Sequence, residues 1–460
     1  MRSILQTLAL VIALTAQAMA GPNIIFIIAD DLGYGDLSCY GQKNFQTPVL
    51  DRLASRGIRF TDHYSGATVC APSRCTLMTG LDNGRATIRG NGEFTLRPDP
   101  ADITVARLLK NAGYRTAMIG KSCVTGNTQN PAEVLGKGFD VFYGTTSHVD
   151  GHWRYPRFVY DQEKRIELSG NALHRGRHHD VPLYTRKALD FLSAQSADQP
   201  FFLLLSYPVP HASVLAPPGD IKGGAGKAPG NSHYTPVADP KAHYIALVRA
   251  LDAAVGQIEK TLGEKGLAED TLILFTSDNG SHSEGGYHPD MLNSSGGLRG
   301  LKRDLYEGGI RVPLIAHWPA GIKKPGPSDF PCGFVDFLPT VCELAGIPVP
   351  PDLDGLSYAP LLDGEKMPQR SRPLYWESHE NRGRRAMRDG RWKLVQYELQ
   401  SAPDAKARKP KLFDLEADPG ESRNLAADHP EQVAKMLAWM KSHRRPSEWF
   451  PFPPLDRLGE

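Results

Sequence analysis

The sequence predicts an α/β fold with a large, mostly parallel sheet, followed by a small antiparallel sheet near the C-terminus. Three short apolar runs, at 23–29, 201–206 and 271–276, are typical of strands that are buried on both faces. Segments with the apolar spacing of helices separate these runs, which indicates parallel βαβ units. After about Gly364 the chain changes to short alternating or aromatic strands with turn signals between them.

Length and composition set the frame for this fold. The 460 residues are enough for one large domain, which we place at 21–364, and a small α+β subdomain, which we place at 365–460. Hydrophobic residues make up 40% of the chain and charged residues 23%, as in ordinary soluble globular proteins. A formal net charge of +2 gives no argument for a nucleic-acid partner or a membrane surface, so any anion recognition must be local.

The first twenty residues have the pattern of a cleaved signal peptide. Arg2 precedes an apolar run that ends in small residues at Ala18 and Ala20. We expect signal peptide 1–20 to be removed, and the mature protein to be periplasmic or secreted. An uncleaved membrane anchor is the alternative, but the apolar core is short for a membrane span.

The first buried strand, at 23–29, runs directly into Asp30 and Asp31. Two adjacent carboxylates at the end of a buried strand repel each other and lose hydration, so a positive group should compensate them. A divalent cation with oxygen ligands would do so. Solvated loop aspartates are the alternative.

The stretch VCAPSRCTLMTG, at 69–80, predicts an anion site with a modifiable cysteine. Pro72 is favoured at the first position of a helix, which would place Cys70 just before the helix N-terminus. Free backbone N–H groups and the helix dipole favour an anion there. Arg74, one turn into the helix, has a forked set of donors for the same anion. A small buried cysteine that only packs the helix start is the alternative.

The remaining elements place further polar residues at strand ends. Helices are expected at 48–57, with Thr47 as cap, and from Asp102 to Gly113, followed by a strand at 114–119. A long helix over 244–262 precedes the strand at 271–276. Ligands of open α/β sheets bind outside the carboxyl ends of the strands. The residues that each follow a predicted buried strand, and that could converge there, are Asp30, Asp31, Lys121, His211, Asp278 and Asn279.

The last third of the chain completes the prediction. A Gly-, Ser- and His-rich stretch from 281 to 309 precedes a strand at 312–316 and a helix at 335–346. The small sheet follows, with a terminal helix at about 432–441. Six cysteines in an exported protein suggest disulfides, and Cys332 with Cys342 is the first candidate pair.

The sequence resembles the type I sulfatases over nearly the whole mature chain. The string from Cys70 to Gly80 matches that family's signature of Cys, a small residue, Pro, Ser, Arg, two variable residues, Leu, one more, Thr and Gly. Further similar stretches are DDLGYGDLSCYG at 30–41, GYRTAMIGK at 113–121, PHA at 210–212, TSDNG at 276–280, LRGLKRDLYEGGIRVP at 298–313, VDFLPT at 335–340 and LFDLEADPGESRNLA at 412–426.

This resemblance implies an alkaline-phosphatase-like α/β fold and the hydrolysis of a sulfate ester, with a carbohydrate sulfate as the expected substrate. It implies that a separate modifying enzyme converts Cys70 to formylglycine (3-oxoalanine), whose hydrate is the nucleophile. Calcium, or magnesium, would be held by Asp30, Asp31, Asp278, Asn279 and modified Cys70. Arg74, Lys121 and Lys302 would hold sulfate oxygens, His211 would protonate the leaving alcohol, and Asp278 would accept the proton of the hydrate.

One departure from the family pattern concerns the second step of the reaction. Many relatives continue after the lysine with Trp and a histidine that assists elimination, whereas Ser122 and Cys123 follow Lys121 here. Cys123 fills that place, or a histidine comes from SHVDGHWRYP, where we favour His152. The residues expected to contact substrate are His148, His288, Asp290 and Arg299.

Two alternatives to a sulfatase remain at this stage. A phosphoesterase or phosphonate hydrolase would use the same metal and cationic groups. A protein that binds sulfated glycans but has lost turnover through the change at Cys123 is the non-enzymatic alternative.

Overall fold

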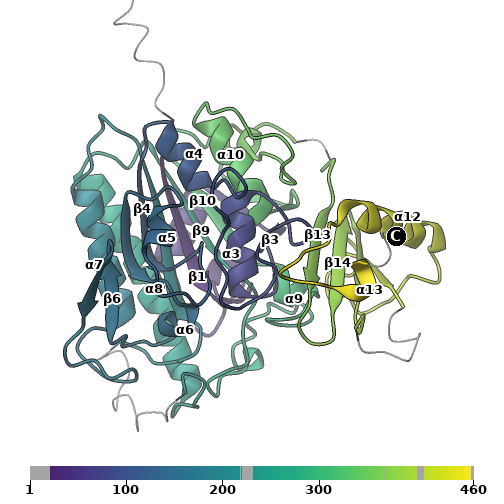
Figure 1. Ribbon diagram of the computed structural model, residues 1–460, viewed down its shortest axis with the longest axis horizontal. Helices are drawn as coiled ribbons and strands as arrows, with labels where there is room; N and C mark the ends of the chain where they lie inside the picture. The colour runs from purple at the N-terminus through teal and green to yellow at the C-terminus, as the bar shows by residue number, and fades with distance from the viewer. Residues whose placement is uncertain (1–20, 218, 220–231, 368, 401–408, 457–460) are drawn as a thin grey trace, which may run out of the picture.

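A ten-stranded mixed sheet forms the centre of the molecule in the computed structural model, with helices on both of its faces (Figure 1). The structure describes residues 21–217, 219, 232–367, 369–400 and 409–456. The expected signal peptide and most of the irregular loop at 219–239 lie outside the described residues.

The strand order of the central sheet is β11-β2-β10-β9-β1-β8-β4-β5-β6-β7. Strands β9, β1, β8, β4 and β5 run parallel, and β10 is antiparallel to β9. The bounds are β1 Asn23–Asp30, β2 Ile58–Phe60, β4 Arg115–Lys121, β5 Val141–Thr145, β6 Phe158–Asp161, β7 Lys164–Glu167, β8 Phe201–Pro210, β9 Thr271–Ser277, β10 Leu314–His317 and β11 Gly326–Ser328. A separate two-stranded ladder pairs β3 (His63–Tyr64) with β12 (Cys332–Gly333).

Alternate side chains of the central strands enter two different hydrophobic cores. Ile25 and Ile27 of β1 pack with residues of α2 (Pro48–Arg56), α7 (Asp180–Ser193) and α8 (Pro240–Glu264). Ile24 and Phe26 pack on the other face with residues of α3 (Cys70–Thr79), α4 (Val105–Asn111) and α10 (Phe337–Leu344). Because both faces are covered, the central strands are uniformly apolar and do not alternate with polar residues.

Short helices complete the large unit and a second sheet follows it. The short helices are α5 Ala132–Leu135, α6 His148–Gly151, α9 Glu307–Ile310 and α11 Ala359–Leu362. The antiparallel C-terminal sheet contains β13 Leu374–Ser378, β14 Arg384–Asp389, β15 Trp392–Gln396 and β16 Lys411–Asp414, in that order. Helices α12 (Pro430–His443) and α13 (Pro453–Asp456) end the described chain. The predicted α/β class with a small antiparallel sheet is confirmed.

A buried ion cluster ties the C-terminal sheet to the large unit. The Lys393 ammonium of β15 lies 2.7 Å from a carboxylate oxygen of Glu307 and 3.0 Å from one of Glu421. All three side chains are fully buried. Burial raises the pKa of Glu421 to about 7, whereas Lys393 and neighbouring arginines outweigh burial at Glu307 and lower its pKa to about 2. Lys393 therefore pairs with both carboxylates, and Arg311 also lies 3.3 Å from Glu307.

Several local expectations need correction. Helix α3 begins at Cys70 and not at Pro72, because the Ser73 N–H already donates to Val69 O at 3.3 Å. Thr104, and not Asp102, caps α4 by accepting the Arg107 N–H. The pair Cys332–Cys342 is wrong, since all six cysteines lie in the described part of the chain and are free. Among the described residues, no helix is both long and apolar enough to span a membrane.

Candidate active site

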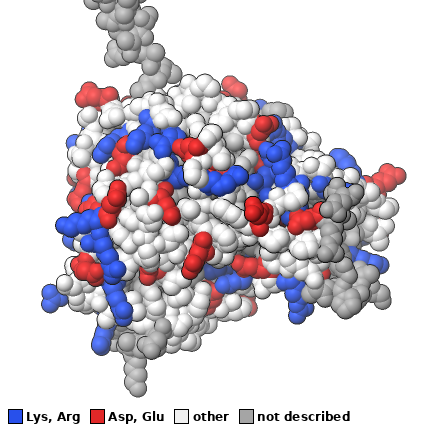
Figure 2. Space-filling view, viewed as in Figure 1, with Lys and Arg blue, Asp and Glu red and all other residues white. Residues whose placement is uncertain are grey.

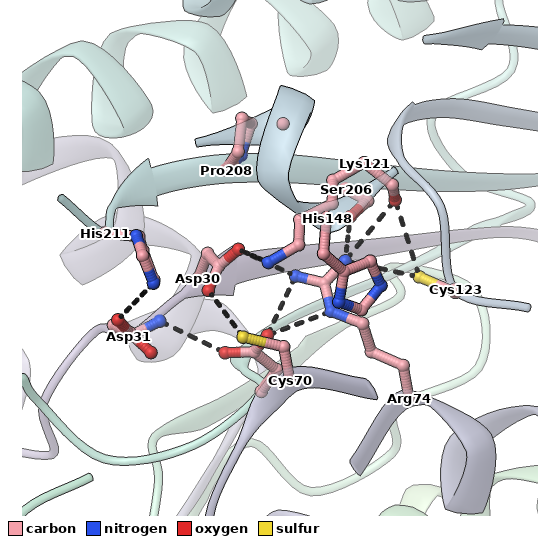
Figure 3. Close-up of polar contacts among 12 residues, drawn as sticks. Asp30, Asp31, Cys70, Arg74, Lys121, Cys123, His148, Ser206, Pro208 and His211 are labelled. Atoms are coloured by element: carbon pink, nitrogen blue, oxygen red, sulfur yellow. Dashed lines mark hydrogen bonds and ion pairs between the residues drawn. The ribbon is translucent and has the colours of Figure 1, made fainter. Parts of the chain in front are cut away.

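The residues predicted to converge do lie together at one edge of the sheet. Asp30 ends β1, Lys121 ends β4 and His211 directly follows β8. Asp278 and Asn279 directly follow β9, and Cys70 begins α3 beside them. Figure 3 shows the Cys70 side chain next to Asp30, with Arg74 and Lys121 beyond it. The Cys70 Sγ lies 3.3 Å from the Asp30 carboxylate, although 40 positions separate the two residues.

Two buried cations compensate the Asp30 carboxylate. The Lys121 Nζ lies 2.5 Å from Asp30 Oδ2, and the Arg74 Nη2 lies 3.3 Å from the same oxygen. Burial by itself would raise the pKa of Asp30, but Lys121, His211 and Arg74 outweigh it, and its pKa is well below the usual value. Asp30 is therefore a stable anion in the interior.

The other two carboxylates are less well compensated. Burial raises the pKa of Asp31, although the Lys302 Nζ lies 2.8 Å from its Oδ2. Burial and the charge of Asp30 raise the pKa of Asp278 to about 6. Burial therefore disfavours the anionic forms of Asp31 and Asp278, and a bound cation would stabilise them.

The donor set at this point fits an oxygen-coordinated cation. Asn279 donates its amide to Asp31 Oδ1 at 2.7 Å, while its buried Oδ1 has no hydrogen-bond partner among the described residues. Ligand atoms of Asp30, Asp31, Cys70 and His211 all lie within 4.8 Å of one another. Asp31 has a φ of 67°, a conformation rare for residues other than glycine, and such strain often marks a functional position. Carboxylate and amide oxygens are the ligands of calcium and magnesium.

Asp36 supports the turn that carries the acidic pair. Its Oδ2 accepts the Gly33 N–H at 2.7 Å and the Tyr244 hydroxyl at 2.6 Å, and its Oδ1 accepts the Ser294 hydroxyl. These hydrogen bonds favour the carboxylate, but burial outweighs them and raises the pKa of Asp36 to about 7. Asp36 is thus a buried acid held by neutral donors.

The Arg74 guanidinium is fully engaged by groups of the chain itself. Its Nε donates to Asp278 Oδ2 at 2.9 Å and its Nη1 donates to the Ser206 hydroxyl at 2.5 Å. Its Nη2 lies 2.8 Å from Asp278 and 3.3 Å from Asp30. Arg74, which was expected to hold sulfate oxygens, bridges two acidic residues in this structure.

Lys302 and His211 form a second polar pair on the opposite side of Asp31. The Lys302 Nζ lies 2.8 Å from His211 Nε2, and both side chains are buried. Burial lowers the pKa of His211, and Lys302 lowers it further. Burial would also lower the pKa of Lys302, but Asp31 and Glu284 outweigh it and raise that pKa. The proton of this pair therefore resides on Lys302.

His152 lies beside Cys70, and Cys123 does not. The His152 Nε2 is 3.1 Å from Lys121 Nζ, and its ring stacks on His211 at 3.8 Å between centroids. Ligand atoms of Cys70, His152 and His211 lie within 4.8 Å of one another. The buried His152 Nδ1 has no hydrogen-bond partner in the described part of the chain. The Cys123 Sγ instead lies 3.6 Å from Arg74 Nη1, behind the site.

The four residues expected to contact substrate are dispersed. His148 is buried and is drawn with the residues of the site in Figure 3. Its Nε2 lies 3.2 Å from Ser122 O. His288 and Asp290 lie at the surface and pair with each other at 3.3 Å. Arg299 donates to Glu421 O at 2.8 Å and covers the Tyr306 ring. Contact of these four residues with substrate stays a prediction.

Several residues at the site were not identified from the sequence. Glu284 receives Arg303 at 2.7 Å and lies 3.4 Å from Lys302. His233 lies over His152, 4.9 Å between ring centroids, and Tyr234 lies against His233. These residues come from loops with no repeating pattern, and only the concentration of His and Glu between 281 and 290 could have indicated one of them.

Comparison with protein families gives two matches to the chain. The family model described as Sulfatase matches residues 22–347. The model described as N-sulphoglucosamine sulphohydrolase, C-terminal, matches residues 300–445. Human arylsulfatase A is 34% identical over 95% of this chain and 91% of its own length. The N-acetylgalactosamine-6-O-sulfatase of Bacteroides thetaiotaomicron is 28% identical over 92% of this chain and 93% of its own length.

Solved structures with the same fold include two from bacterial carbohydrate systems. A sulfatase structure from work on glycosaminoglycan metabolism by Bacteroides thetaiotaomicron has a TM-score of 0.73 and 26% identity, and the match covers 92% of this chain and 99% of that one. Ps i-CgsB in complex with k-i-k-neocarrahexaose has a TM-score of 0.75 and 25% identity, and the match covers 95% and 96%. The alkaline-phosphatase-like arrangement expected from the sequence is confirmed.

Proposed function

We propose that this chain, which belongs to the sulfatase family and is a sulfuric ester hydrolase, acts on a sulfate ester of a carbohydrate. The observation that carries the proposal is the position of the Cys70 Sγ, 3.3 Å from Asp30, among buried acids and buried cations. Relatives named as carbohydrate sulfatases support the sugar, including the N-acetylgalactosamine-6-O-sulfatase.

The cation of the proposed site is calcium, with magnesium as the second choice. Oxygen atoms of Asp30, Asp31, Asp278 and Asn279 would hold it, and the unpartnered Asn279 Oδ1 supports this ligand set. Residue 70 would complete the site after a separate enzyme oxidises its Cβ to an aldehyde with loss of the sulfur. When bound, the cation and the aldehyde hydrate supply an oxygen nucleophile near neutral pH.

The basic side chains of the chain would bind the tetrahedral anion. The Nζ atoms of Lys121 and Lys302 lie on opposite sides of the acidic group, bonded to Asp30 and Asp31 respectively. Fixed cations in a site without water stabilise charge that develops on sulfate oxygens, and they need no reorganisation. Arg74 would hold Asp278 and Asp30 in position for this task.

Proton transfers can be assigned to three side chains. Asp278 would take the proton of the nucleophile, since its pKa is raised toward neutrality by burial. His211, whose Nε2 lies 2.8 Å from Lys302 Nζ, would protonate the oxygen of the departing alcohol. His152 would take the proton whose loss allows sulfate to leave residue 70, and its free Nδ1 supports this role.

We further propose that the protein is exported, with residues 1–20 as its signal peptide. The pattern of Arg2, an apolar run and small residues at 18 and 20 supports this. Purification from the periplasm and medium, followed by sequencing of the N-terminus, would test it. A mature chain that begins at Met1 would contradict it.

The function itself can be tested by mass spectrometry and product analysis. Protein produced with a formylglycine-generating enzyme should carry an aldehyde in place of the Cys70 thiol, and it should release inorganic sulfate from members of a panel of defined sulfated sugars. Phosphate analogues of the same sugars should react more slowly. Fully converted protein that releases no sulfate from the panel or from p-nitrophenyl sulfate would overturn the proposal.

The assignment of His152 needs its own variant. In His152→Asn, one equivalent of alcohol should be released in a burst, followed by slow turnover, with kcat reduced about 10²- to 10⁴-fold. His429→Asn, a change at an exposed histidine of the C-terminal region, serves as the control and should keep wild-type kinetics. Wild-type turnover in His152→Asn would rule the role out.

A further inference from the structure

A groove rich in arginine runs between the loop that follows α3 and the segment that follows α12. One hollow of about 390 Å³ is lined by Arg85, Arg89, Arg97, Arg445 and Trp449. A second hollow of about 290 Å³ shares Arg85 with the first and is also lined by Arg372 and Trp439. We call these two neighbouring hollows the arginine groove. Figure 2 shows basic side chains in a band across the upper half of the face that contains this boundary.

Arg97 reaches solvent, and its acidic partner lies behind it. The Arg97 side chain is 48% exposed, whereas its partner Asp102 is fully buried and also accepts the Arg97 N–H and the Thr87 hydroxyl. The Arg85 and Arg89 side chains are only 15% and 3% exposed, and they pair with Asp354 and Glu377. Of these three arginines, Arg97 is therefore the one that a ligand in the groove meets first.

Arg445 and Arg372 carry charges that no carboxylate in the described part of the chain pairs with. Both residues are exposed, and Arg372 donates to the carbonyl oxygen of Leu353. The Arg445 backbone N–H donates to Gly84 O at 2.9 Å, which fixes its position against the loop after α3. Glu448 and Asp352 are the exposed acids at the rim. An exposed, unpaired arginine on an ordered backbone is available for an anion.

Aromatic rings accompany these cations. Trp449 is 43% exposed and stacks on Phe94, 5.9 Å between ring centroids. Trp439 lines the second hollow and stacks on His443 at 4.3 Å. The apolar face of a sugar ring packs on such indoles, while arginine forks match the oxygens of tetrahedral anions.

The groove is physically connected to the active site by one loop. The segment from Arg85 to Arg97 carries Asn91, whose Oδ1 accepts the Ala71 N–H at 3.2 Å, one residue beyond Cys70. Phe94 of the same segment is the ring that supports Trp449. A chain that occupies the groove is therefore held by the same loop that closes over the start of α3.

We propose that the arginine groove is a second binding site, outside the reaction centre, for a sulfated polysaccharide chain. The identity of the ligand rests on the proposed function, since a carbohydrate sulfatase meets polymers that carry many sulfates in addition to the one it removes. Nucleic acid is the competing occupant, because its phosphates carry the same charge as sulfate esters, and the proposed function favours the polysaccharide. The groove accordingly favours polymeric substrates over small esters.

Binding of dextran sulfate to the full-length protein, measured by titration calorimetry at fixed ionic strength, tests the proposal. Arg445→Glu should weaken binding at least about fivefold and Trp449→Ala about threefold to tenfold. Lys260→Glu is the matched control, because Lys260 is 76% exposed on α8, lines neither hollow and undergoes the same charge reversal. Hydrolysis of p-nitrophenyl sulfate should be unchanged in all three variants.

Three results would overturn the proposal. Equal losses in Arg445→Glu and Lys260→Glu would mean that only overall charge attracts the polymer. Tight binding of a thymidine 20-mer that Arg445→Glu abolishes would assign the groove to nucleic acid instead. Absence of dextran sulfate binding by the wild type would mean that the groove does not bind sulfated polysaccharides. Failure of p-nitrophenyl sulfate hydrolysis would count against the proposed function alone, since the binding measurements do not depend on turnover.

Discussion

Replacing Asp36 with asparagine should make the folded protein less sensitive to rising pH. Asp36 is fully buried, and its partners are one backbone N–H and two hydroxyl groups. Burial raises its pKa from 3.8 to about 7, whereas an unfolded chain would ionise it near its usual value. Asparagine can keep the acceptor for Gly33 and has no charge to bury.

The sign and size of the effect follow from proton linkage. Between pH 4 and pH 7 the folded state holds a proton on Asp36 that the unfolded state has released, so stability falls as the pH rises through this range. One pKa unit corresponds to about 1.4 kcal/mol. With the two pKa values above, Asp36 lowers the free energy of unfolding of the wild type by about 2.5 kcal/mol more at pH 8 than at pH 5.

Urea denaturation of both proteins at several pH values measures this difference. The free energy of unfolding of Asp36→Asn minus that of wild type should rise by about 2.5 kcal/mol from pH 5 to pH 8. Contributions of all other titrating groups cancel in the difference. Asp290→Asn removes a carboxyl that is 91% exposed and serves as the control. A difference for Asp36→Asn that stays constant within about 0.5 kcal/mol would refute the reasoning.

The other predictions concern the interface, the site and the cation. Lys393→Met should lower the free energy of unfolding by about 3 to 5 kcal/mol, because it leaves the buried Glu421 carboxylate without a cation and Glu307 with Arg311 alone. The exposed Lys435→Met should cost less than about 1 kcal/mol, and equal costs in chemical denaturation would contradict this. Arg74→Lys should reduce kcat about 10²-fold or more, since an ammonium cannot bridge Asp278 and Asp30, and wild-type turnover of p-nitrophenyl sulfate would disprove it. Removal of the cation with EGTA should lower the Tm of the wild type, because protein in cation at 100 times its Kd loses about 2.7 kcal/mol of stability. Asn279→Ala should reduce this shift in Tm. A Tm that is unchanged by EGTA would argue against a bound cation.

The sequence was most informative where one physical rule covered several residues. Buried apolar runs identified β1, β8 and β9, and the rule that ligands bind at strand carboxyl ends brought Asp30, His211 and Asp278 together from distant positions. The signature at Cys70 singled out the cysteine that lies beside them. These inferences depend on periodicity and on chain direction, which are local properties of a sequence.

Features set by competition between neighbours could not be predicted in this way. Pro72 is a good first residue of a helix, yet α3 starts two residues earlier, since its missing N–H is equally unneeded at the third position. Asp102 is a good cap, but its carboxylate is occupied by Arg97 and Thr87, and Thr104 takes the place. Glu284 and His233 reach the site from irregular loops, so no period marks them.

The burial of α3 imposes an order of events on biosynthesis. All ten of its residues are buried, and Cys70 is only 2% exposed. In the folded protein this cysteine is too buried to enter the active site of another enzyme. Under the proposed function, the enzyme that oxidises Cys70 would have to act before the chain folds, and protein that folds unmodified would stay inactive. Refolding a purified, unmodified batch would then restore the fold without activity.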